Sequence, residues 1–223
     1  MLCSGFVKLK RSGGEVEAKR AFEELVSGNT RFASGDPSML RSRFAAMPNM
    51  DMQQRPHTVV VGCADSRVPP ELIFDQGIGD LFVIRVAGNV VGPTQLGSIE
   101  FAVSHFGPRL VVVLGHSDCG AVLATMEQVV SKKRNYSVQL SSIINEISPA
   151  ISPLQEVFDE EGTTLPVVDA VRSNIRLAMD NIRTTSEVLS PMISSQEVVV
   201  VGGYYSLKDR IVDFFEGVPK DWQ

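Results

Sequence analysis

The sequence predicts an α/β fold in which helices flank a mostly parallel central β-sheet. Four short apolar runs are continuous rather than alternating, which is typical of strands that are covered on both faces. Segments with helical spacing lie between these runs. The chain has 223 residues, of which 43% are hydrophobic, and this is enough for one domain with a substantial core. We therefore expect residues 1–223 to form a single domain, with residues 1–15 as a mobile N-terminal extension.

The first predicted element is a helix over residues 16–33, which precedes the sheet and could lie across a neighbouring subunit. The predicted buried strands are residues 58–62, 81–86, 110–114 and 198–201. The further predicted helices are residues 94–106, 120–130 and 165–189. The last of these helices has Pro166 near its start and Pro191 beyond its end. A final apolar run, residues 210–215, predicts an antiparallel edge strand near the C-terminus.

Composition excludes several classes of protein. The net charge is -5, and the one short basic run, residues 132–134, is typical of a solvated helix end, so we expect no nucleic-acid partner. No apolar stretch approaches the ~18 residues of a membrane helix, so we expect no membrane partner. Three cysteines argue against a disulfide framework and favour a reducing compartment. We expect a cytoplasmic protein, with a targeting segment removed from a longer precursor as the open alternative.

Reactive side chains follow two of the predicted strands. Cys63, Asp65 and Arg67 come directly after the first strand, and His116 and Cys119 follow the third in a turn that contains glycine. Ligands of such sheets gather at the carboxyl ends of the strands. If the first and third strands are neighbours, two thiolates and one imidazole converge there, and this donor set suits zinc. Three protein ligands leave a fourth position open, as in catalytic zinc sites.

Few residues could complete this set as a fourth ligand. His57 lies six residues before Cys63 in sequence, which is about 20 Å along an extended strand. Cys3 belongs to the predicted extension, and His105 falls in a different helix with no spacing that links it to the site. Asp65 is therefore the only close candidate for a fourth ligand.

The two motifs together closely resemble those of the β-class carbonic anhydrases. The sequence "CADSRV" is followed, 53 residues after its cysteine, by "HSDC", and "GSIEFAVSHFG" lies between them. The resemblance covers nearly the whole chain and implies that Cys63, His116 and Cys119 bind Zn²⁺ and that Asp65 and Arg67 form a catalytic dyad. It implies reversible hydration of CO2 to bicarbonate and a proton, by a zinc-bound hydroxide that the dyad orients. It also implies a homodimer, or a tetramer built from dimers, with interfacial active sites and the N-terminal helix packed on a partner subunit.

The resemblance and the apolar character of CO2 together predict five positions that bind substrate. Gln54 and Phe82 match residues that the family contributes largely from the partner subunit, and Gly120 matches a glycine whose backbone N–H faces the site. Val68, Phe82 and Phe101 could form an apolar wall for CO2, which is small and apolar. Phe101 stands where many relatives carry a tyrosine, so the wall is kept and a hydroxyl is lost.

Two other functions stay open at this point. Relatives of this fold hydrolyse CS2 or COS with the same zinc and dyad, and tunnel shape or assembly would separate them from this chain. A non-catalytic protein stabilised by zinc is the other alternative, although the presence of every ligand and dyad residue weighs against it. A cysteine phosphatase is excluded by spacing, because Cys63 and Arg67 form C-x-x-x-R, and a thiol oxidoreductase is excluded because C-x-x-C is absent.

Overall fold

The computed structural model describes residues 14–36, 54–131, 136–160 and 162–222. Residues 1–13 of the predicted extension and the basic run 132–134 lie outside this part, whereas residues 14 and 15 belong to the first helix. The elements in chain order are α1 (Gly14–Ser34), β1 (Thr58–Gly62), α3 (Pro70–Ile73), β2 (Leu81–Arg85), η2 (Ala87–Asn89), α4 (Pro93–Phe106), β3 (Leu110–His116), α5 (Gly120–Ser131), α6 (Val138–Glu160), α7 (Val167–Thr185), α8 (Leu189–Ser194), β4 (Val199–Tyr205), β5 (Val212–Glu216) and η3 (Lys220–Trp222).

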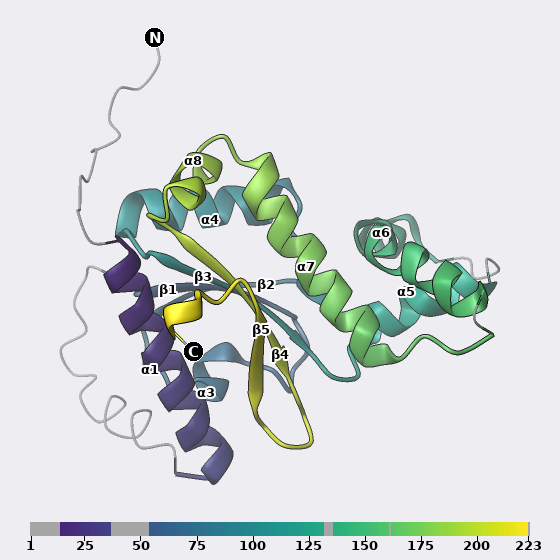
Figure 1. Ribbon diagram of the computed structural model, residues 1–223, viewed down its shortest axis with the longest axis horizontal. Coiled ribbons are helices and arrows are strands. Elements are labelled where there is room, and N and C mark those ends of the chain that lie inside the picture. Colours follow the sequence, from purple (N-terminus) through teal and green to yellow (C-terminus); the bar gives the residue numbers. More distant parts are fainter. Residues whose placement is uncertain (1–13, 37–53, 132–135, 161, 223) are drawn as a thin grey trace.

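The sheet has the strand order β2-β1-β3-β4-β5 (Figure 1). Strands β1 to β4 are parallel, and β5 pairs antiparallel with β4 at one edge, so the predicted α/β class and antiparallel edge strand are confirmed. Every residue of β1 and β3 is buried, which explains why their apolar runs do not alternate. The chain leaves β1 toward β2 on one side and leaves β3 toward β4 on the other. The carboxyl ends of β1 and β3 therefore lie at a topological switch point, where α/β sheets bind ligands.

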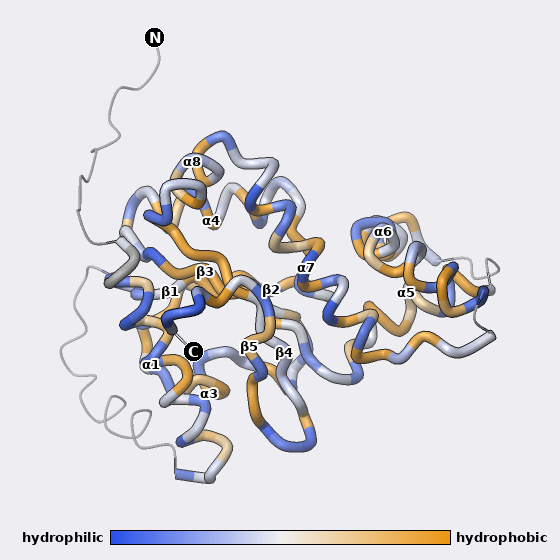
Figure 2. The backbone as a smooth tube through the Cα atoms, viewed as in Figure 1, coloured by the Kyte–Doolittle hydropathy of each residue, from blue (hydrophilic) through white to orange (hydrophobic). Residues whose placement is uncertain are grey.

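Helices cover both faces of the sheet. Figure 1 shows α4, α7 and α8 on one side and α1 and α3 on the other, and Figure 2 shows hydrophobic segments concentrated between these layers. Helix α7 approaches the sheet closely, since a Cβ at Gly115 of β3 would lie 2.7 Å from the side chain of Ile175. Among the residues that the structure describes, no helix has the length and apolarity that a membrane crossing requires.

Helix α1 packs on its own chain. Ala18 and Leu25 are fully buried, and the ring of Phe22 lies 4.8 Å from that of Phe214 on β5. The Asn29 side chain donates to two backbone carbonyls and accepts a hydrogen bond from the N–H of Val212, so it joins α1 to the start of β5. Packing of the exposed face of α1 on a partner subunit stays a prediction.

The structure corrects two predictions about helices. Helix α6 was not predicted, because Pro149 and Pro153 interrupt its pattern and proline is unfavourable inside a helix. The predicted helix over residues 165–189 ends at Thr185, because Ser186 is extended. The Ser186 hydroxyl accepts a hydrogen bond from the N–H of Leu189. A separate helix, α8, begins at Leu189 and contains Pro191. Figure 1 shows α5 and α6 together at one end of the molecule, away from the sheet.

Candidate metal centre

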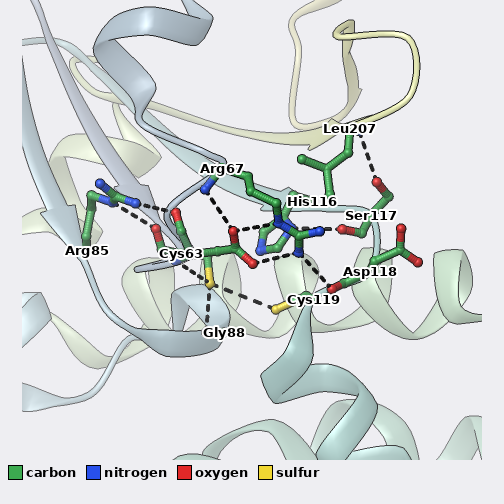
Figure 3. Close-up of polar contacts among 10 residues, drawn as sticks. Cys63, Arg67, Arg85, Gly88, His116, Ser117, Asp118, Cys119 and Leu207 are labelled. Carbon is green, nitrogen blue, oxygen red and sulfur yellow. Dashed lines mark hydrogen bonds and ion pairs between the residues drawn. The ribbon is translucent and has the colours of Figure 1, made fainter.

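Three side chains with metal-binding atoms meet at the switch point. Cys63 follows β1, His116 ends β3 and Cys119 follows it, and their ligand atoms all lie within 4.8 Å of one another (Figure 3). All three residues are buried. The two sulfur atoms are 4.0 Å apart and both cysteines are free. Two thiolates bound to one tetrahedral zinc at ~2.3 Å would be about 3.8 Å apart, so the observed separation fits this metal.

The imidazole of His116 is oriented for metal binding. Its Nδ1 atom lies 2.8 Å from the carbonyl oxygen of Ser117, which can only accept, so Nδ1 carries the proton. The unprotonated Nε2 is buried and has no hydrogen-bond partner in the described part of the chain. Burial lowers the pKa of His116, but Cys63, the Ser117 carbonyl and the charge of Asp65 together outweigh burial, so the pKa is raised. A bound cation would satisfy Nε2 and favour the neutral imidazole.

The two thiols differ in their protonation. The pKa of Cys63 falls to about 4, because the Cys119 thiol stabilises its thiolate and outweighs the cost of burial. The N–H groups of Asp65 and Gly88 also donate to its sulfur, each at 3.4 Å. The pKa of Cys119 is raised by its hydrogen bond to Cys63 and by burial, although N–H groups in the first turn of α5 oppose this. Binding of a metal ion would favour the deprotonated form of both thiols.

A carboxylate and a guanidinium lie beside this cluster. Asp65 Oδ1 accepts hydrogen bonds from the backbone N–H and the Nε of Arg67, both at 2.9 Å, and Oδ2 accepts one from Nη2 at 2.8 Å. This two-pronged contact is the strong geometry for such a pair. Donation by the Arg67 side chain holds the pKa of Asp65 well below its usual range. A turn in which Val68 N–H donates to the carbonyl of Asp65 brings the two residues together.

Two of the five predicted substrate positions are close in sequence to the residues of the cluster. Gly120 is the first residue of α5 and directly follows Cys119, and a Cβ at this position would meet no atom within 4 Å. Val68 lies in the turn after Cys63 and is only 2% exposed, so it is part of the core.

The other three predicted positions are separated from the cluster of the same chain. Gln54 is exposed and precedes β1, whereas Cys63 follows that strand. Phe82 pairs with Val59, which is four residues before Cys63 and so about 13 Å away along the strand. Phe101 is 47% exposed on α4, and its ring lies 6.4 Å from that of Phe82. One chain therefore does not gather all the predicted substrate residues around its own candidate metal ligands.

The contacts of two further residues with the site were not predicted from the sequence. Arg85, at the end of β2, donates from Nε to the carbonyl of Cys63 at 2.9 Å and from Nη2 to the carbonyl of Asp65 at 2.5 Å (Figure 3). Gly88 donates its backbone N–H to the Cys63 sulfur. Both contacts follow from the packing of β2 and the segment after it against β1. A charged residue and a glycine near the end of a third predicted strand marked the two positions in the sequence, but not their contacts.

This fold and this cluster together define an α/β protein with a candidate metal centre at the switch point of its sheet. The family model described as "Carbonic anhydrase" matches residues 58–212. The carbonic anhydrase of Mycolicibacterium smegmatis is 33% identical over 193 residues, which cover 86% of this chain and 91% of the relative. Carbonic anhydrase 2 of Mycobacterium tuberculosis is 33% identical over 189 residues, with 85% and 88% covered.

Solved structures share the fold. The β-carbonic anhydrase CafA of Aspergillus fumigatus has a TM-score of 0.67 at 22% identity, over 90% of this chain and 94% of that one. A tetrameric β-carbonic anhydrase of Sordaria macrospora has a TM-score of 0.64 at 22% identity, over 88% and 98%. The chain belongs to the β-class carbonic anhydrase family, and the predicted family is thereby confirmed.

Proposed function

We propose that this chain is a zinc-dependent carbonic anhydrase that interconverts CO2 and bicarbonate. The observation that carries the proposal is the buried Cys63, His116 and Cys119 cluster with the Asp65–Arg67 pair beside it. The donor set, the sulfur separation and the unsatisfied Nε2 of His116 all fit Zn²⁺. Membership of the family and the names of the relatives support the same activity.

Each residue of the proposed site has a distinct role. Cys63, His116 and Cys119 would hold Zn²⁺, which when bound lowers the pKa of a coordinated water and supplies the nucleophile. Asp65 stays ionised through the neutral range because of Arg67, and it accepts a hydrogen bond from the attacking water. This hydrogen bond turns an oxygen lone pair toward CO2, which lowers the entropic cost of attack.

Arg67 also keeps the fourth ligand position open. It occupies both oxygens of Asp65 through its side chain, so the carboxylate is not free to act as a ligand. Without that contact, Asp65 is close enough in sequence to Cys63 to reach the metal and displace water. The Asp65–Arg67 pair would therefore orient the attacking water and also prevent Asp65 from taking the fourth ligand position.

The proposed active site includes a second copy of the chain. Gln54, Phe82 and Phe101 lie away from the cluster of their own chain, and the last two form an aromatic pair on β2 and α4 in which Phe82 is partly buried and Phe101 is exposed. We propose a homodimer, or a tetramer of such dimers, in which the partner subunit's Gln54 and the partner subunit's Phe82 complete each site. Val68 and Gly120 would come from the chain that holds the metal.

Metal analysis combined with a CO2 hydration assay tests the proposal. The wild-type protein is expected to carry stoichiometric zinc and to hydrate CO2, and Cys63→Ser is expected to lose both. Cys3→Ser, which alters the cysteine outside the proposed ligand set, is the matched control and should retain both. A zinc-replete protein that hydrolyses CS2 or COS but does not hydrate CO2 would identify the alternative hydrolase. A zinc-replete protein inactive on all three would point to a non-catalytic zinc protein.

A further inference from the structure

A chain of hydrogen bonds connects helix α7 to one of the candidate metal ligands. Asn174 lies on the buried face of α7 and is 2% exposed. Its Nδ2 donates to the carbonyl oxygen of Gly88 at 2.8 Å. Gly88 in turn donates its own N–H to the Cys63 sulfur at 3.4 Å, as Figure 3 shows. A single residue therefore separates the Asn174 amide from the ligand sulfur.

The conformation of Gly88 makes this link depend on its surroundings. Its φ of 72° and ψ of 16° lie in the left-handed region, which glycine adopts without strain. A Cβ here would lie 2.6 Å from the Ile147 side chain on α6 and 3.1 Å from Cβ of Ala121 on α5. Glycine is also the most freely rotating residue, so its peptide groups need external contacts to fix them. Asn174 fixes the peptide group that follows Gly88, and through φ and ψ this sets the direction of the Gly88 N–H.

The Gly88 N–H acts on the charge of the sulfur. A hydrogen bond to a thiolate stabilises the negative charge on sulfur and reduces the electron density that it donates to a metal. Two thiolates cancel the charge of a divalent cation, so each such donor restores some of its electrophilicity. The other backbone donor to Cys63, the N–H of Asp65, belongs to the ligand's own loop. Gly88 comes from a separate segment and is anchored by α7.

From this geometry we infer that Asn174 is a positioning residue of the metal centre. It orients Gly88 so that the Gly88 N–H donates to the Cys63 thiolate, and it thereby makes the bound metal a stronger Lewis acid. The inference rests on the proposed metal-binding function. If Asn174 only satisfied a buried carbonyl, its loss would lower stability and leave the electronic properties of the metal unchanged.

Cobalt substitution gives a readout that stability alone does not move. In the Co²⁺-loaded protein, removal of a hydrogen bond from a ligand thiolate shifts the thiolate-to-cobalt charge-transfer absorption to longer wavelength. Asn174→Leu is expected to show this shift relative to wild type. Asn174→Ala should show the same shift, and it replaces Asn174→Leu in the experiment if the leucine side chain prevents folding. With zinc, the same variants should lose about 10-fold in CO2 hydration at neutral pH and recover toward the wild-type rate in alkali.

The control lies on the same helix. Asn181 also donates its Nδ2 to a backbone carbonyl, that of Val91 at 3.4 Å, but no residue links it to a ligand sulfur in the described part of the chain. Asn181→Leu should therefore leave the charge-transfer band and the pH profile unchanged, and urea unfolding of each variant measures its loss of stability. An Asn174 variant that is destabilised while its band and pH profile match wild type would overturn the inference. A wild-type protein that shows no charge-transfer band with Co²⁺ would instead refute the proposed metal site itself.

Discussion

At the scale of single residues, Arg67 decides what Asp65 does. A carboxylate two residues from a ligand cysteine can act as a metal ligand or as a hydrogen-bond acceptor. The guanidinium donates to both of its oxygens and lowers the pKa of Asp65, and under the proposed function this contact also keeps the carboxylate off the metal. The proposed roles of Asp65 and Arg67 therefore depend on each other.

Replacement of Arg67 tests this coupling. We expect Arg67→Ala to lose at least about 100-fold in CO2 hydration and to retain its zinc, because the three ligands are unchanged. Arg67→Lys keeps a positive charge but cannot form the two-pronged contact, so its rate should fall between those of Arg67→Ala and wild type. Stopped-flow hydration and metal analysis on the same samples measure both quantities. Full activity in Arg67→Ala would contradict the proposed roles of the pair.

The pH dependence of activity follows from the same charges. The lowered pKa of Asp65 means that its carboxylate protonates only at a pH below the usual pKa of an aspartate. The carboxylate is therefore ionised throughout the neutral and alkaline range. Asp65 therefore contributes no change in rate near neutrality. Two thiolate ligands make a zinc-coordinated water less acidic than three imidazoles would. We expect kcat/KM for hydration to rise from about pH 6.5 to about pH 9, and a flat profile over this range would contradict a Cys-His-Cys zinc site.

At the scale of elements, the ends of the strands were predictable and their surroundings were not. The apolar runs before Cys63 and His116 identify two buried parallel strands, and parallel strands present their carboxyl ends at one edge. Whether β1 and β3 are neighbours depends on long-range strand pairing, which the sequence does not show. The sequence therefore predicted only that the candidate ligands converge if these two strands are neighbours. The contacts of Arg85 and Gly88 depend on how β2 and η2 pack against β1, which no local pattern encodes.

Helix α6 shows the same limit for a whole element. Its two prolines give an unfavourable local signal, yet the helix runs from Val138 to Glu160 because α5 and α7 pack against it. Ile147 on this helix is fully buried and would meet any side chain placed at Gly88. An element that sequence patterns did not predict therefore shapes the segment that contacts the Cys63 sulfur.

Substitution of Gly88 separates backbone strain from packing. Gly107 also has a positive φ, but a Cβ there would meet no atom within 4 Å. Gly107→Ala should therefore lower the free energy of unfolding by only about 1 kcal/mol and leave zinc affinity unchanged. Gly88→Ala adds the contacts with Ile147 and Ala121, so it should cost more and also weaken zinc binding. Urea unfolding and competition with a zinc chelator measure the two effects, and equal behaviour of the two variants would contradict this account.

At the scale of the whole molecule, one chain is an incomplete enzyme under the proposed function. Its candidate metal ligands lie at the carboxyl ends of β1 and β3, whereas Gln54 precedes β1 and Phe82 lies on the edge strand β2. The residues of β2 are only partly buried, and Phe101 nearby is half-exposed, so this edge presents apolar surface to solvent in a single chain. Exposed apolar edges of sheets are typical of surfaces that pair with another chain. The residues missing from each site would thus be supplied across this edge.

Subunit complementation tests whether Gln54 acts across the interface. Cys63→Ser removes the metal site of its own chain but keeps Gln54, and Gln54→Ala does the reverse. If Gln54 acts in the partner's site, a mixed dimer has one site with both lesions and one site that is fully wild type. Co-refolding equal amounts of two nearly inactive variants should then restore roughly a quarter of the wild-type hydration rate, since half of the dimers are mixed and each restores one site of two. If Gln54 acted within its own chain, both sites of the mixed dimer would carry a lesion and mixing would restore nothing.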